Sequence, residues 1–225
     1  FYTLWAPKWR QHGSEWQAFL GDDEAVLAFN SPAELLCFVE SDTKHDLLDH
    51  PQWDQFAGRD ADRVTPAKRD EYDLIGMPEA LAGRPSHQNV STVARNLEIA
   101  SALADVAGAE HTTIFFASHS ILRNVSRGAD HYSGEQGMSE WSGVGHVIAG
   151  NWKAVIEDLD KHVRVVSSDD FDAAKVSDAK ERISSSAAAS AAAAKEAEEK
   201  RKAAAEAADP YDNSPWAAAG IDPIK

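Results

Sequence analysis

The sequence has one cysteine, Cys37, and so it excludes any internal disulfide. Such sparse use of cysteine fits a reducing compartment, and we expect a cytoplasmic protein. No apolar run approaches the roughly 18 residues of a membrane span, so we expect no membrane insertion. The first residues, FYTLWAPKWRQ, lack both the apolar region of a signal peptide and an initiator Met. We therefore expect the chain to be a piece of a longer protein.

Basic residues are also scarce. The chain holds 22 Lys and Arg against 37 Asp and Glu, which gives a formal net charge of −15. A nucleic-acid-binding surface normally carries a basic patch, so this balance argues against a nucleic-acid partner. The same charge repels anionic lipid and keeps a concentrated protein in solution.

Motifs for catalysis or cofactor binding are missing. Nine histidines are scattered with no His-x-x-x-His, Cys-x-x-Cys or HExxH pattern, and no GxxxxGK[ST] phosphate loop is present. Ser118-His119-Ser120 lacks the Gly-x-Ser-x-Gly elbow that exposes a nucleophile. We therefore expect a protein that is not an enzyme and needs neither ATP, metal nor another cofactor.

Two polar clusters keep other possibilities open. Asp46, Asp49 and His50 have metal-ligating groups, although a solvated polar loop is the simpler explanation. Asp130-His131 stabilises a turn in the simplest interpretation. A deep polar pocket formed by His119, Asp130 and His131 would instead indicate an unrecognised small-molecule enzyme.

The N-terminal part has the pattern of a small antiparallel sheet with a helix on it. Short apolar or alternating runs at 2–5, 15–20 and 24–29 predict strands, and Gly21-Asp22-Asp23 predicts a hairpin turn. Ser31, Pro32 and Glu34 then form a capping box at the start of a helix that ends near Ser41.

Helices dominate the rest of the globular part. The longest apolar stripe, at 89–107, predicts a central helix, and Gly108 suits its C-terminal cap. Stripes at 139–149 and 151–162 predict two further helices separated by Gly150. Residues 42–85 are expected to form short helices and turns, while 112–125 fits either a strand or a helical turn. The overall prediction is an α+β domain over residues 1–165.

Residues 166–225 have a different composition. Their core, residues 184–209, is Ala, Glu and Lys without an apolar stripe, so a helix there would bury nothing by itself. The segment is either a frayed or disordered tail, or a tether whose aromatic end at Trp216 docks on a partner or on its own domain.

Aromatic residues are the most distinctive feature of the composition. Seven of the residues are tryptophans, and Trp5, Trp9, Trp16 and Phe19 crowd the first twenty positions. They either pack the two faces of the sheet or line an exposed apolar groove, which would mark a peptide site. The other candidates for such a groove are Phe115, Phe116, Ile121 and Leu122. An apolar groove on a highly charged surface is what a chaperone requires.

Four stretches carry a family resemblance: the aromatic start with GDDEAVLAFNSPAELLCFVES, YDLIGMPEAL, GHVIAGNWKAVIEDLDKHV, and the Ala/Glu/Lys tail. Together they resemble the actinobacterial family of SatS C-terminal domains, known from mycobacteria, whose members have carried a primosomal label. The resemblance implies a cytoplasmic protein-export chaperone that binds particular preproteins, prevents their aggregation and supports the accessory SecA-dependent pathway. It also implies an unusual topology with hydrophobic grooves, and no metal, nucleotide or catalytic residue. A replication accessory protein, suggested by the primosomal label, and a small-molecule enzyme are the alternatives.

Overall fold

The first two strands of the chain form an antiparallel hairpin. The computed structural model describes residues 1–22, 24–41 and 43–207. Strand β1 (Trp5–Gln11) pairs antiparallel with β2 (Ser14–Phe19) through a turn at His12 and Gly13, which have φ angles of 51° and 83°. Glycine adopts this left-handed conformation without steric cost. At the turn predicted near Gly21 the chain also reverses: Gly21 forms an antiparallel bridge with Val26, Asp22 N donates to Ala25 O at 3.1 Å, and Leu27 N donates to Leu20 O at 2.8 Å.

A second pair of strands belongs to the N-terminal lobe, the part of the molecule whose apolar cluster runs from Leu20 to Val64. Strand β3 (Val26–Ala28) pairs in parallel with β4 (Val163–Val165), which follows the last helix of the globular part. Between them in sequence lies α1 (Pro32–Val39), which begins as predicted: Ser31 Oγ accepts a hydrogen bond from Glu34 N at 3.2 Å. The Glu34 carboxylate accepts from Asn30 N rather than from the cap residue itself.

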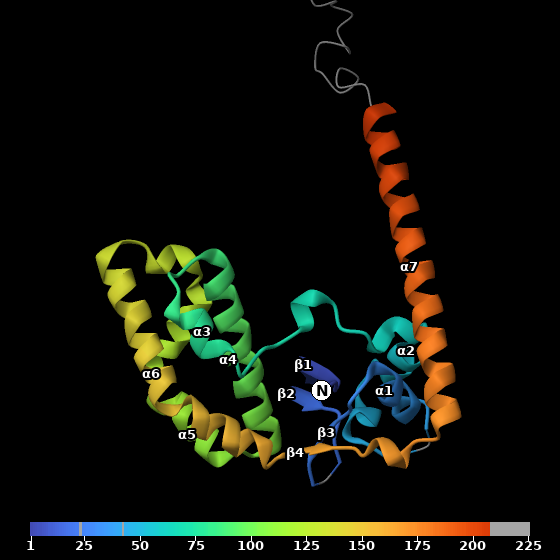
Figure 1. Cartoon of the computed structure of the whole chain (residues 1–225), viewed down its shortest axis with the longest axis horizontal. Coiled ribbons are helices and arrows are strands. Elements are labelled where there is room, and N and C mark those ends of the chain that lie inside the picture. Colours follow the sequence, from blue (N-terminus) through green and yellow to red (C-terminus); the bar gives the residue numbers. More distant parts are fainter. Residues whose placement is uncertain (23, 42, 208–225) are drawn as a thin grey trace, which may run out of the picture.

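Four helices form a helical lobe at the other side of the hairpin (Figure 1). They are α3 (Met77–Ala82), α4 (His87–Ala107), α5 (Glu110–Ser118) and α6 (Gly134–Asp160), with 3₁₀ turns η4 (Ser120–Arg127) and η5 (Ala129–Tyr132) between α5 and α6. Helix α4 confirms the predicted central helix, down to the left-handed Gly108 cap.

One local prediction about this lobe is wrong, and the structure decides another that the sequence left open. The two helices expected around Gly150 are one continuous helix, α6, because an isolated glycine costs a helix only about 1 kcal/mol. Residues 112–125 contain no strand and are divided between α5 and η4.

Short elements connect the two lobes. The chain passes through η1 (Asp46–Asp49), α2 (Trp53–Ala57), η2 (Ala61–Val64) and η3 (Lys68–Asp70). One apolar cluster fills each lobe, and a third, containing Phe19, Val26, Ile99 and Ala102, joins β2 and β3 to α4. The hairpin is therefore anchored to both lobes.

After β4 and the turn η6 (Ser168–Asp170), helix α7 (Ala173–Ala207) packs its first half on the N-terminal lobe. Ala179 is buried, and Val176 and Ile183 are half-buried in the same cluster. Arg182 donates to both carboxylate oxygens of Glu40 at 2.7 and 2.8 Å. From residue 191 to 205 every side chain is exposed, and the helix extends away from the lobes (Figure 1). Trp216, the predicted docking residue, lies outside the described residues.

These elements confirm the α+β class, with a small antiparallel sheet packed against several helices. In the portion of the chain that the structure describes, no helix is both long and apolar enough to cross a membrane.

Candidate functional site

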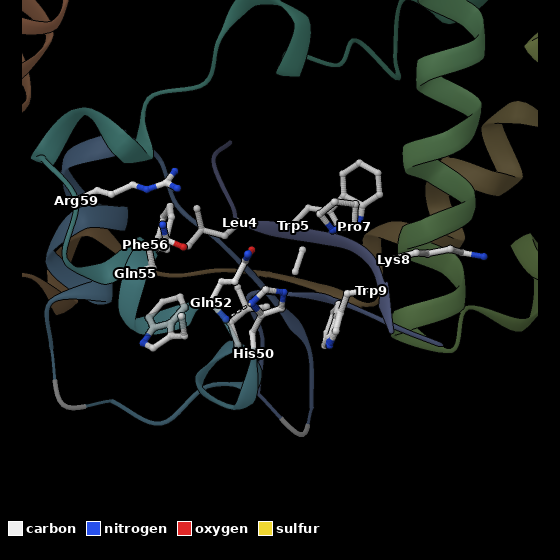
Figure 2. A pocket seen from close by; sticks show the side chains of 13 residues that line it. Leu4, Trp5, Pro7, Lys8, Trp9, His50, Gln52, Gln55, Phe56 and Arg59 are labelled. Carbon is white, nitrogen blue, oxygen red and sulfur yellow. Dashed lines mark hydrogen bonds between the residues drawn. The ribbon is translucent and has the colours of Figure 1, made fainter. Parts of the chain in front are cut away.

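An open apolar groove of about 370 Å³ runs between β1 and the η1–α2 segment (Figure 2). We call it the tryptophan groove. Its apolar lining comes from two stretches of the chain that are about 45 residues apart. The lining residues are Leu4, Trp5, Ala6, Pro7, Lys8, Trp9, Leu47, His50, Gln52, Trp53, Gln55, Phe56 and Arg59.

A shift in strand pairing turns the two tryptophans of β1 in different directions. Trp5 lies opposite Phe19 in the register, and Trp9 lies opposite Trp16, with an irregularity between Ala6 and Trp9. Because Phe19 and Trp16 are three positions apart on β2, the two pairs face opposite sides of the hairpin. Trp5 stacks on Phe19 with ring centroids 5.8 Å apart. Trp9 is therefore free to line the groove from the other side.

Trp9 contacts the opposite wall of the groove at the ring of His50. The two ring centroids are 4.5 Å apart in an edge-on arrangement. His50 Nδ1 accepts a hydrogen bond from Gln52 N at 3.1 Å, drawn as the dashed line in Figure 2. This bond requires a ring without a proton on Nδ1, and it fixes the orientation of the imidazole.

The opposite wall is an aromatic stack on short helical turns. Trp53 and Phe56, three positions apart on α2, have ring centroids 5.6 Å apart, and Trp53 also meets the edge of His45 at 4.5 Å. His45 is only 9% exposed, and this burial lowers the pKa of its imidazole. His45 thus packs against the Trp53 ring, and buried Leu47 also lines the groove.

The charged groups of the lining are all basic. Arg59 and Lys8 lie at opposite ends of the lining, and no aspartate or glutamate belongs to it (Figure 2). Lys8 Nζ is 3.1 Å from Glu15 on β2. Within the described residues no ion pair forms with Arg59.

The structure brings only some of the sequence-predicted residues together. Trp5 and Trp9 line the tryptophan groove; Trp16 is 55% exposed but outside the lining, and Phe19 is buried beneath the hairpin. Sequence analysis did not assign Trp53 and Phe56 to a site. The signal available was their three-residue spacing after Pro51, which predicts a helical turn with both rings on one side.

The second predicted set lies in the helical lobe. Phe115 and Leu122 are 5% exposed and belong to its core. Phe116 and Leu122 line a separate groove of about 560 Å³ formed by α4, α5 and η4. Ile121 points instead toward α6, where a Cβ at Gly143 would lie 3.0 Å from its Cδ1. The eight predicted residues are therefore distributed over two grooves, the core and the surface.

The polar residues considered for catalysis do not converge. His119 Nδ1 is 2.8 Å from the Phe115 carbonyl, and His131 Nε2 is 3.1 Å from Glu140. The Asp130 side chain is almost fully exposed. None of the three lines either groove. Among the residues described, no group of three or more His, Cys, Asp and Glu is placed to hold a metal ion.

Comparisons with known proteins give one match. A family model described as the SatS C-terminal domain matches residues 1–160. No curated protein matches the chain significantly, and no solved structure does either. The matched residues include β1, α2 and the whole tryptophan groove. Since the match covers well over half of its length, the chain belongs to the SatS C-terminal domain family.

Proposed function

We propose that this domain is a chaperone that holds apolar segments of preproteins in the tryptophan groove without using ATP. It thereby prevents aggregation and supports accessory SecA-dependent export. The observation that carries the proposal is the groove itself, an aromatic-lined surface that is open to solvent in a strongly charged protein. The export pathway rests on the resemblance of the chain to its family.

The lining suits transient contact with apolar side chains. Trp9, Trp53 and Phe56 present ring faces and edges, and Trp and Phe bind well through large apolar area with few rotatable bonds. A volume of about 370 Å³ is near the lower end of ligand pockets, so the groove accepts a short segment. Burial contributes about 25 cal/mol per Å² before ordering costs are subtracted, which favours weak and reversible binding.

The charge of the protein supports the same function in a second way. With a formal net charge of −15, complexes of this domain with an unfolded client repel one another. Aggregation is therefore opposed in two ways: the groove covers an apolar segment, and the charged surface keeps one complex away from the next. Neither effect requires a nucleotide.

The test is light scattering of an export preprotein diluted from denaturant, with and without the domain. We expect suppression at near-equimolar ratio, unchanged by ATP. Trp9→Ala removes one wall of the groove at a half-buried position and should weaken the suppression severalfold. Ile75→Ala is the control, because Ile75 is 74% exposed and lies outside the groove. Absence of suppression by the unmodified domain, while a reference chaperone works, would contradict the proposal.

A further inference from the structure

The tryptophan groove differs in charge from the rest of the molecule. The protein has 37 acidic and 22 basic residues, yet its thirteen lining residues include Lys8 and Arg59 and no carboxylate. Asp54 and Asp60 are close in sequence to lining residues but are not part of the lining. A groove lined at random from this composition would more often be acidic than basic.

The two basic side chains lie at opposite ends of the groove, and at least one of them is free to pair with a ligand. Figure 2 shows Arg59 at the α2 end and Lys8 at the β1 end, with the aromatic and apolar side chains between them. Arg59 is exposed and forms no ion pair within the described part of the chain, so its guanidinium is available. Lys8 is bound to Glu15 only through a surface contact in which both side chains are about half exposed or more.

We infer that the tryptophan groove selects short apolar segments that carry a carboxylate beside the apolar residues. The inference rests on the proposed function and narrows its substrate class. The apolar residues of the segment lie against Trp9, Trp53 and Phe56. The flanking carboxylate pairs with Arg59, whose planar guanidinium accommodates it in two parallel hydrogen bonds.

The charge of the whole protein does not decide this selection. At an ionic strength of about 0.15 M the Debye length is about 8 Å, so exposed charges farther away are largely screened. The lining itself carries Lys8, which is paired with Glu15, and Arg59, which forms no ion pair within the described residues. A segment flanked by lysines is therefore disfavoured in this groove, although the net charge of −15 would attract it at low salt.

Two synthetic peptides test the inference. Both have the same central run of leucine and phenylalanine; one is flanked by aspartates and the other by lysines. Binding to the full chain is measured by calorimetry at about 0.15 M salt and again at 1 M. We expect the aspartate peptide to bind about two- to fivefold more tightly, the range for one exposed ion pair, and the preference to disappear at 1 M.

Two charge reversals locate the effect. Arg59→Glu should abolish or invert the preference, whereas Lys153→Glu should leave it unchanged, because Lys153 is 90% exposed on α6 in the helical lobe. Both substitutions change the net charge by the same amount. Equal binding of the two peptides, tighter binding of the lysine peptide, or an equal response to both variants would overturn the inference.

The failure of the inference can be distinguished from failure of the proposed function. If both peptides bind equally and Trp9→Ala weakens both, the groove holds apolar segments without charge selection. If neither peptide binds and preproteins are not protected from aggregation, the proposed function itself is wrong.

Discussion

The first half of α7 is part of the folded domain, and a matched pair of substitutions tests this. Ala179 is 2% exposed against the N-terminal lobe, and Ala193 lies exposed four turns farther along the same helix. We compare Ala179→Asp with Ala193→Asp. Both variants add one negative charge and carry the same loss of helix propensity, about 0.5 kcal/mol. They differ in whether the new carboxylate enters a packed surface.

The expected difference follows from the contacts of this helix. A carboxylate at position 179 must be desolvated among Val176, Ile183 and the apolar residues of the lobe, which costs about 3 kcal/mol when no partner is placed for it. For a domain of this size, 1 kcal/mol shifts the melting temperature by about 2–4 °C. We therefore expect Ala179→Asp to lower the melting temperature by about 6–12 °C.

Thermal unfolding followed by circular dichroism measures the two variants and a chain that ends at Ser190. Ser190 Oγ donates to Asp62 at 2.8 Å, and it is the last described residue of α7 with a hydrogen bond to the lobe. Ala193→Asp and the shortened chain should melt within about 2 °C of the original protein. Both changes affect only exposed residues, and such changes usually alter the free energy of unfolding very little. Equal destabilisation by Ala179→Asp and Ala193→Asp would refute the packing described for α7.

Four further substitutions test burial, packing and hydrogen bonding. Burial lowers the pKa of His45, so the folded state favours the neutral imidazole and the protein loses stability as the pH falls below about 6.5. His45→Phe removes this group, so the drop in melting temperature between pH 7.5 and pH 5.5 should become smaller. Gly137→Ala should cost about 1–3 kcal/mol in denaturant unfolding, because its Cβ would clash with the backbone of Tyr132. Gly145→Ala meets nothing within 4 Å and should gain up to about 1 kcal/mol. Asp158→Ala removes the acceptor for the backbone N–H and hydroxyl of Thr112 near the start of α5, and chemical denaturation should show a loss of about 1–2 kcal/mol; an unchanged midpoint would contradict that role.

Elements governed by neighbouring residues were predicted well. Ser31 and Glu34 place the start of α1, and the apolar stripe and Gly108 define α4, because caps and helical faces depend on residues within a few positions of one another. The family resemblance was also carried by such local patterns. Gly150 misled the prediction, since a glycine signal is local whereas the packing that keeps α6 continuous is not.

The candidate site could be predicted only in part. Trp5 and Trp9 were expected in a groove, but Phe19 belongs to the core, and nothing local separates the three. Their environments depend on the register shift within β1 and on α2, which brings Trp53 to the same place from a distant part of the sequence. Exposure of an aromatic ring is a property of what packs on it.

The sequence by itself determined the α+β class, the family, the high acidic charge and the helices that have their own caps. Only the tertiary structure decided the pairing of β3 with β4, the packing of α7 through Ser190 and the basic ends of the tryptophan groove. Each of the latter joins segments that are far apart in sequence. Such contacts form when the free energy gained by burying both segments exceeds the entropy cost of closing the loop between them. This comparison leaves no periodic pattern in the sequence.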